Sequence, residues 1–191
     1  MTIDRRAFVA SLLSACPDAL VVTGLGSPSY DAFAAGDRPG NFYLWGAMGG
    51  AAALALGLAL AQPARSVIAI TGDGEQLMGL GALATAAVQR PANLTIVVLD
   101  NGHFGETGMQ RSHSSLGLNL AAVAKGCGIE DAFIVRDIAG VEGVAQRVNA
   151  RAGISFAQVI VASEELPRAL PPRDGVYLKN RVRDHLGLAP L

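Results

Sequence analysis

Charged side chains and aromatic rings are both scarce in this chain of 191 residues. Asp, Glu, Lys and Arg make up 16% of it, and Phe, Trp and Tyr make up 5%. A soluble domain of average composition is about one quarter charged, so we expect something other than water to cover part of the surface. The 15 basic and 16 acidic side chains give a formal net charge of -1, and no basic block stands out. This balance argues against nucleic acid as a partner.

Cysteines and long apolar runs are also few. Cys16 and Cys127 are the two cysteines, and they form neither a paired metal-binding motif nor a disulfide framework. A reducing cytoplasm is the simplest location for such a chain. The longest uncharged apolar run, residues 47–61, contains three glycines and is shorter than a membrane span. We therefore expect a buried helix there and no membrane partner.

The start of the chain has two interpretations. Arg5 and Arg6, followed by an apolar stretch and Cys16, imitate a twin-arginine export signal with a lipoprotein-type cysteine. The apolar stretch at residues 7–13 is very short for such a signal, and a strand pattern follows with no spacer. We favour an amphipathic first helix at residues 5–15 that ends before Pro17. Whether the signal-like pattern is ever processed stays open.

Apolar runs alternate with helical patterns through most of the chain, which indicates an α/β protein with a parallel sheet. We predict a three-layer α/β/α fold with about six parallel strands, in one domain over residues 1–191. Its core spans residues 15–165, and residues 166–191 form an extension with a last helix. Strands are expected at residues 20–23, 42–44, 67–71, 94–99, 132–135 and 157–161. Helices are expected at residues 29–35, 49–61, 76–89, 118–126, 141–151 and 176–186.

One stretch carries most of the chemistry. The strand at residues 67–71 is followed by Gly72-Asp73-Gly74, a helix and a second strand, and that strand ends in Asp100-Asn101-Gly102. Strand, helix and strand form a right-handed βαβ unit. Because ligands bind at the carboxyl ends of parallel strands, we expect Asp73 and Asn101 to meet at one edge of the sheet.

A carboxylate and an amide oxygen at one edge suit Mg2+, which usually completes its coordination with water and phosphate oxygens. The backbone N–H groups of Gly74 and Glu75, at the start of the next helix, add an anion site. A diphosphate is therefore the natural ligand. Gly-Asp-Gly by itself is also an ordinary turn.

This pattern resembles the motif of thiamine diphosphate (ThDP) enzymes, in the domain that binds the cofactor's diphosphate. The resemblance implies that the Asp73 carboxylate, the side-chain oxygen of Asn101 and the backbone oxygen of His103 hold Mg2+. The family motif usually ends in two asparagines, and here the first is Asp100. The metal-binding position is the second, Asn101, so this departure does not remove the ligand.

Two earlier turns are candidates for further cofactor contacts. Gly26 and Ser27 follow the first strand, where the backbone either packs tightly or contacts phosphate. Met48 precedes Asp73 by twenty-five residues, the spacing at which many ThDP enzymes place a large apolar residue that holds the cofactor bent. The resemblance also implies that the Gly46 carbonyl and the Met48 N–H bind the aminopyrimidine. The alternative for Met48 is an ordinary core methionine.

The segment after Asn101 is expected to overhang the cofactor. Phe104 and Gly105 are candidate cofactor contacts, while Glu106 and His103 are candidates for handling protons or orienting substrate. A solvated loop is the alternative.

Further along the same loop, Arg111 or His113 could pair with an acid group of the substrate. Residues 101–110 are similar to the loop of sulfopyruvate and phosphonopyruvate decarboxylases. The loop departs from that group at His103, Met109 and Arg111, which leaves the substrate open.

ThDP enzymes also need an activating glutamate, which the family supplies from a separate pyrimidine-binding domain. This chain has room for one such domain. The resemblance therefore implies the β subunit of a split 2-oxo acid decarboxylase, in a hetero-oligomer (α2β2 or larger) with a pyrimidine-binding subunit and with a small 2-oxo acid as substrate. An acetolactate synthase-like carboligase and a non-catalytic ThDP-binding regulatory module remain alternatives. A Rossmann nucleotide site is disfavoured because residues 24–29 lack the third glycine of G-x-G-x-x-G.

Overall fold

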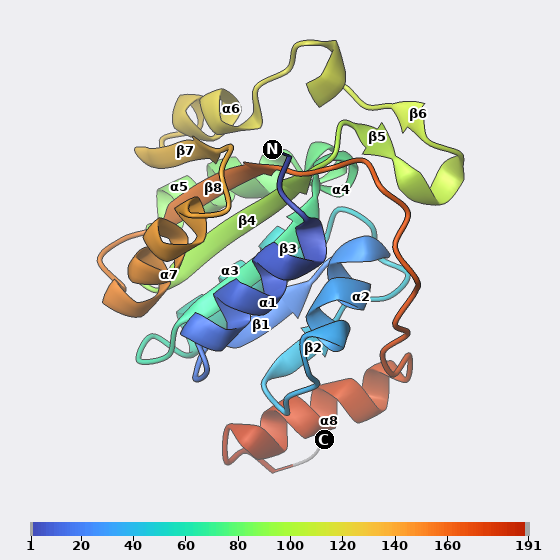
Figure 1. Ribbon diagram of the computed structural model, residues 1–191. Coiled ribbons are helices and arrows are strands. Elements are labelled where there is room, and N and C mark those ends of the chain that lie inside the picture. Colours follow the sequence, from blue (N-terminus) through green and yellow to red (C-terminus); the bar gives the residue numbers. More distant parts are fainter. Residues whose placement is uncertain (1, 190–191) are drawn as a thin grey trace.

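A six-stranded parallel sheet forms the centre of the computed structural model, which describes residues 2–189 (Figure 1). The strand order is β2-β1-β3-β4-β8-β7, and every neighbouring pair is parallel. The strands are β1 (Leu20–Thr23), β2 (Asn41–Tyr43), β3 (Val67–Gly72), β4 (Leu94–Asp100), β7 (Asp131–Val135) and β8 (Ser155–Ile160). The prediction of about six parallel strands is confirmed.

Helices cover both faces of the sheet. One hydrophobic cluster joins the sheet to α1 (Arg5–Ala15), α2 (Ser27–Ala34) and α7 (Gly140–Ala150). A second cluster joins the opposite face to α3 (Ala51–Ala61), α5 (Gly81–Gln89) and α6 (Leu120–Gly126). In β1, Val21 packs into the first cluster and Val22 into the second, as expected for a strand buried on both sides. The three-layer prediction is confirmed, and the expected first helix has its predicted bounds.

The last helix, α8 (Gly175–His185), lies beside the edge strand β2 (Figure 1). Asp174 caps its N-terminus, and Leu178 and Val182 are its buried residues. The segment between β8 and α8 runs along the outside of the molecule past the β5–β6 region and α2 (Figure 1). The described part of the chain has no helix with the length and apolar character needed to cross a membrane.

The single helix predicted at residues 76–89 is wrong. Two helices occupy the region, α4 (Asp73–Met78) and α5, with Gly79 as the residue that follows α4. A Cβ atom on Gly79 would lie 2.2 Å from the carbonyl oxygen of Gly49. The helix therefore breaks where two glycine backbones pass closer than any side chain would allow.

The segment after Asn101 is more regular than a solvated loop. Strand β5 (His103–Phe104) pairs antiparallel with β6 (Gln110–Arg111), and a short 3-10 helix, η1 (Gly105–Thr107), joins them. A second 3-10 helix, η2 (Ser114–Leu116), follows. At the turn, Gly108 and Met109 have φ angles of 114° and 59°, a conformation that favours glycine at the first position and is uncommon for methionine. This small hairpin holds the predicted site residues beside the end of β4.

Candidate active site

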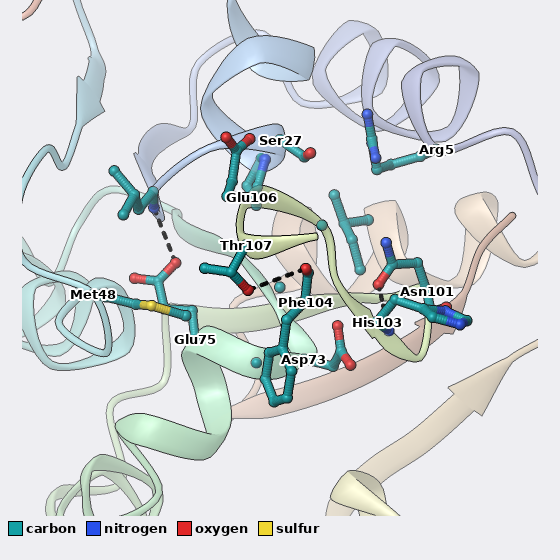
Figure 2. A pocket seen from close by; sticks show the side chains of 16 residues that line it. Arg5, Ser27, Met48, Asp73, Glu75, Asn101, His103, Phe104, Glu106 and Thr107 are labelled. Atoms are coloured by element: carbon teal, nitrogen blue, oxygen red, sulfur yellow. Dashed lines mark hydrogen bonds between the residues drawn. The ribbon is translucent and has the colours of Figure 1, made fainter. Parts of the chain in front are cut away.

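A cavity of about 200 Å3 opens at the carboxyl ends of β3 and β4, beside the turn after β1 (Figure 2). Most residues predicted for the site line it together. These are Ser27, Met48, Gly72, Asp73, Gly74, Glu75, Asn101, His103, Phe104, Gly105 and Glu106. Gly26 and Gly46 are not among its lining residues. The topological argument that Asp73 and Asn101 meet at one edge of the sheet therefore holds.

Asp73 is a buried carboxylate with an accessible fraction of 2%. Its Oδ2 atom accepts hydrogen bonds from the hydroxyl groups of Ser112 and Ser114, the second at 3.1 Å. Burial raises the pKa of Asp73, the two serines act in the opposite direction, and the charge of Asp100 adds to the increase. Both hydroxyls bond to Oδ2, and the backbone N–H of Asp73 itself also interacts with the carboxylate. Within residues 2–189, no arginine or lysine forms an ion pair with Asp73.

Asp100, where the family motif usually has asparagine, belongs to the same polar network. Its Oδ1 atom accepts from Ser114 Oγ at 2.6 Å and from the Gly102 backbone nitrogen at 2.9 Å. Its Oδ2 atom accepts from Gln158 Nε2 at 2.6 Å. The single hydroxyl proton of Ser114 is thus shared between two buried carboxylates, and it lies closer to Asp100. Each oxygen of the Asp100 carboxylate therefore has a hydrogen-bond donor.

Asn101 and His103 are linked at the end of β4. The Asn101 side-chain oxygen accepts a hydrogen bond from the His103 backbone nitrogen at 2.9 Å, and the His103 ring nitrogen Nδ1 lies 2.8 Å from the Asn101 carbonyl oxygen. Because a carbonyl oxygen only accepts, Nδ1 carries the proton and Nε2 is left as the acceptor of a neutral ring. Residues 2–189 hold no cluster of three or more His, Cys, Asp or Glu suited to a metal. A metal here would therefore need amide or backbone oxygens besides Asp73.

Glu75 joins three turns of the site through its side chain. Its Oε2 atom accepts from the Leu25 backbone nitrogen at 3.0 Å, and its Oε1 atom accepts from the Gly49 backbone nitrogen at 3.3 Å. A Cβ atom on Gly24 would lie 1.6 Å from Oε2, so only glycine fits against this carboxylate. Burial raises the pKa of Glu75, and the hydrogen bonds that it accepts lower it. The sequence predicted a role for the Glu75 N–H group, but not this bridge.

Two apolar side chains lie over the Gly74 backbone. A Cβ atom on Gly74 would lie 2.7 Å from the Phe104 ring and 3.8 Å from the Met48 methyl carbon. Met48 is 42% exposed, so it is not an ordinary core methionine. Figure 2 shows Met48 beside Glu75. Both apolar side chains line the cavity next to Gly74.

Glu106 lies over the turn after β1. A Cβ atom on Gly26 would lie 3.0 Å from Glu106 Oε1, and Gly26 has a φ angle of 77° that favours glycine. Glu106 Oε2 also forms an ion pair at 3.1 Å with Arg168, in the segment between β8 and α8. The C-terminal extension therefore contacts a predicted catalytic residue.

Other candidates lie away from the cavity. Gly46 precedes Met48 with a φ angle of 71°, and a Cβ atom on it would meet no other atom within 4 Å. Arg111 donates to the Ser115 hydroxyl at 3.2 Å and to the Ser115 carbonyl oxygen, and His113 packs edge-on against Phe104 with ring centroids 6.3 Å apart. Neither Arg111 nor His113 lines the cavity, so the suggestion that they bind a substrate acid group has no support from this geometry.

Sequence reasoning missed three contributors to the site. Ser112 and Ser114 form hydrogen bonds with the Asp73 carboxylate. The available signal was their position in the sequence, in the same loop as the proposed metal ligand His103. Arg5 also lines the cavity, although its position suggested only a helix start or an export signal. The signal for Arg5 was Asp31, a carboxylate in an otherwise mostly apolar helix.

Comparison with known proteins agrees with this geometry. Residues 28–159 match the model of the thiamine pyrophosphate enzyme family, C-terminal TPP-binding domain. The chain belongs to this family. The matched region includes Met48, Asp73, Asn101 and Glu106, so the family assignment covers most of the cavity. The predicted family and its thiamine pyrophosphate-binding domain are confirmed.

Two relatives of this TPP-binding chain have names that state an activity. The chain is 42% identical over 111 residues to the sulfopyruvate decarboxylase subunit beta of Methanocaldococcus jannaschii, covering 58% of each chain. It is 46% identical over 125 residues to the phosphonopyruvate decarboxylase of Streptomyces viridochromogenes, covering 65% of this chain and 31% of that protein. The match thus spans less than two thirds of either relative.

The fold of this TPP-binding chain is also that of a solved enzyme. The benzoylformate decarboxylase of Polynucleobacter necessarius superimposes with a TM-score of 0.73 and 20% sequence identity. The superposition covers 87% of this chain and 34% of that one. At this identity the likeness establishes the fold.

Proposed function

We propose that the chain is the ThDP- and Mg2+-binding β subunit of a split 2-oxo acid decarboxylase, of the sulfopyruvate or phosphonopyruvate decarboxylase type. The observation that carries the proposal is Asp73: a buried carboxylate in a TPP-binding domain, with serine hydroxyls on one oxygen and no cationic partner among the described residues. Burying an unpaired carboxylate is costly, and a bound divalent cation would remove that cost.

The side chains and backbone around the cavity fit the metal. Asp73 Oδ1, the Asn101 side-chain oxygen and the His103 backbone oxygen would hold Mg2+, with phosphate oxygens and water completing its coordination. Such a set contains one charged side chain, in agreement with the absence of a cluster of three acidic, histidine or cysteine ligands in residues 2–189.

The remaining residues would bind and orient the cofactor. Gly72 and Gly74 allow its diphosphate to approach the backbone, where the N–H groups of Gly74 and Glu75 donate hydrogen bonds. Gly26 and Ser27 offer a second set of N–H groups. These turns keep their relative positions through the Glu75 bridge.

At the other end of the cofactor, Met48 would support the bent arrangement of the rings, while Gly46 and Met48 would bind the aminopyrimidine edge through their backbones. Phe104 and Gly105 would cover the cofactor from the β5–β6 hairpin. When bound, ThDP supplies the electron sink that the loss of CO2 requires.

Two side chains are proposed to act on the substrate. Glu106, which is partly exposed and paired with Arg168, would orient the substrate or transfer a proton. His103 would accept a proton at Nε2, because Nδ1 is committed to the Asn101 carbonyl oxygen. In enzymes generally, hydrogen-bond donors held in fixed positions in a water-poor site stabilise the charge that develops in the transition state.

A partner subunit would complete the enzyme. We propose that it supplies the activating glutamate from a pyrimidine-binding domain, in an assembly with two or more copies of each subunit. The "subunit beta" in the name of the M. jannaschii relative supports this arrangement. Leu60, Met78 and Val88 expose 47%, 65% and 77% of their surface, which gives a partner apolar area to cover.

The proposal also extends to the organisation and location of the chain. We propose one domain over residues 1–191, with a core at 15–165 and an extension at 166–191. Cys16 and Cys127 are both free, which supports a reducing cytoplasm as the location.

The test is reconstitution. The chain is mixed with a candidate pyrimidine-binding subunit, ThDP and Mg2+, and the release of CO2 from sulfopyruvate, phosphonopyruvate and pyruvate is measured. We expect turnover of one of these acids by the mixture and none by the chain alone. Full activity of the chain alone would refute the split enzyme. Condensed products would indicate the carboligase, and cofactor binding without turnover of any 2-oxo acid would indicate the regulatory module.

A further inference from the structure

Arg5 belongs to a buried ion cluster at the start of α1. Its Nε atom donates to Asp31 Oδ2 in α2, and the Nε atom of Arg6 donates to Asp31 Oδ1 at 3.1 Å. The accessible fractions of Arg5 and Asp31 are 7% and 0%. Two guanidinium groups thus share one carboxylate, and the cluster retains one unit of positive charge. The Arg6 side chain is 27% exposed, so water solvates part of this charge, whereas the Arg5 guanidinium lies in the protein interior.

The two arginines differ in where they lie. Arg5 lines the cavity at the Gly72-Asp73-Gly74 turn (Figure 2). It also lines a neighbouring cavity of about 80 Å3 that is bounded by the C-terminal extension. Arg6 lines neither, and its Nη2 atom donates instead to the Pro167 carbonyl oxygen at 2.8 Å. Arg5 therefore borders both cavities, and Arg6 borders neither.

Arg5 is also the only arginine or lysine among the described residues that line the larger cavity. None of the acidic residues that line this cavity forms an ion pair with Arg5: Asp73 accepts from two serines, Glu75 from backbone N–H groups, and Glu106 pairs with Arg168. Asp31 takes one of the five N–H donors of the Arg5 guanidinium, which leaves four. A planar guanidinium held in place by one carboxylate suits two-pronged binding of an oxyanion.

We propose that Arg5 is an oxyanion-binding residue of this site, and that Asp31 positions it. The inference rests on the proposed function and extends it by naming the cationic group that the ligand meets. The oxyanion is either the diphosphate of the cofactor or the acid group of the substrate, since both lie within this pair of cavities in the proposed enzyme. Arg6, which shares Asp31 but not the cavity, is the matched control.

The first measurement uses inorganic pyrophosphate with Mg2+ as the probe, titrated calorimetrically into the purified chain. If Arg5 meets the diphosphate, Arg5→Gln should weaken pyrophosphate binding by about tenfold or more. Arg6→Gln removes the same kind of ion pair from Asp31 and should leave the pyrophosphate affinity unchanged. Should Arg5→Gln not fold, Arg5→Lys and Arg6→Lys replace the pair, and only the first should weaken binding.

The second measurement uses the complex with the partner subunit. If Arg5 meets the substrate instead, Arg5→Gln leaves pyrophosphate affinity unchanged and raises the KM for sulfopyruvate about tenfold relative to Arg6→Gln. If the Arg5 and Arg6 variants differ neither in pyrophosphate affinity nor in KM, Arg5 is only structural and the inference is wrong. Failure of the wild-type complex to decarboxylate any acid would refute the proposed function, while the pyrophosphate comparison would still decide the role of Arg5.

Discussion

The Glu75 carboxylate lies 3.0 Å from the backbone nitrogen of Leu25, fifty residues earlier in the chain. This hydrogen bond ties the turn after β1 to the start of α4, and a second one at 3.3 Å reaches Gly49 before α3. The three turns that we propose to surround the cofactor therefore share one buried anchor. Their relative positions depend on the hydrogen bonds of one side chain.

Replacing Glu75 should loosen this arrangement. Glu75→Ala leaves the Leu25 and Gly49 N–H groups without their acceptor, so we expect the free energy of unfolding to fall by about 2 kcal/mol or more and ThDP affinity to fall with it. Glu75→Gln keeps one acceptor oxygen and should show a smaller loss of both. Urea denaturation and cofactor titration measure the two effects. Wild-type stability in Glu75→Ala would contradict the anchoring role.

The buried carboxylates should also make the metal-free chain sensitive to pH. Burial raises the pKa of Asp73 and Glu75 above their ordinary values of 3.8 and 4.5. Their contribution to stability is therefore fully present below those ordinary values and is lost as the pH rises through the raised, folded-state pKa values. We expect Glu75→Gln to lose less stability than wild type as the pH rises above the ordinary glutamate pKa of 4.5, as measured by urea denaturation. A steeper loss in the variant would contradict the raised pKa.

The Asp73→Asn variant tests metal-dependent ThDP binding separately from folding stability. The variant keeps an acceptor for Ser112 and Ser114 but loses the charge that we propose binds Mg2+, so metal-dependent ThDP binding should disappear. Folding stability without metal should be equal or higher, because a buried charge has been removed. Calorimetric titration and thermal unfolding check the two results. If the variant still binds ThDP in a metal-dependent way, Asp73 is not a metal ligand.

Asp100→Asn is the control for that experiment, since it restores the asparagine usual in the family motif. It also removes one carboxylate charge next to the proposed metal, but it keeps Asp73 and Asn101. We expect ThDP to bind in the presence of Mg2+, with stability lower by about 1 kcal/mol because Gln158 Nε2 loses its acceptor.

Met48→Ala tests the proposed support of the bent cofactor. Met48 is 42% exposed, so its truncation should change folding stability little. Misplacement of the cofactor rings should lower kcat about tenfold, while ThDP affinity, set mainly by the diphosphate, should fall less. Ile138→Ala, at a 44% exposed position outside the cavity, should change neither value. Equal losses of kcat and affinity in Met48→Ala would count against the supporting role.

Glu106→Gln tests the proposed substrate residue. Because its ion pair with Arg168 joins two partly exposed side chains, breaking it should cost less than about 1 kcal/mol of stability. We expect kcat on the reconstituted complex to fall at least tenfold in Glu106→Gln and much less in Arg168→Ala, which only frees the carboxylate. Similar kcat values for the two variants would indicate that Glu106 acts only through the ion pair.

The sequence by itself determined the layered fold and the approximate positions of Asp73 and Asn101, the two side chains that we propose bind the metal. Strands buried on both faces have a recognisable apolar pattern, and parallel strands place their carboxyl ends at one edge, which brings Asp73 near Asn101. The break between α4 and α5 escaped this reasoning, since it depends on how closely Gly79 approaches Gly49 rather than on local helix preference.

Only the tertiary structure decided how the site is completed. The contacts of Ser112 with Asp73, of Leu25 with Glu75 and of Arg5 with Asp31 join residues 39, 50 and 26 positions apart. No periodic pattern records such pairs, because each depends on how loops and helices from different strands pack over the same edge of the sheet. The residue types were visible in the sequence, but their partners came from the packing.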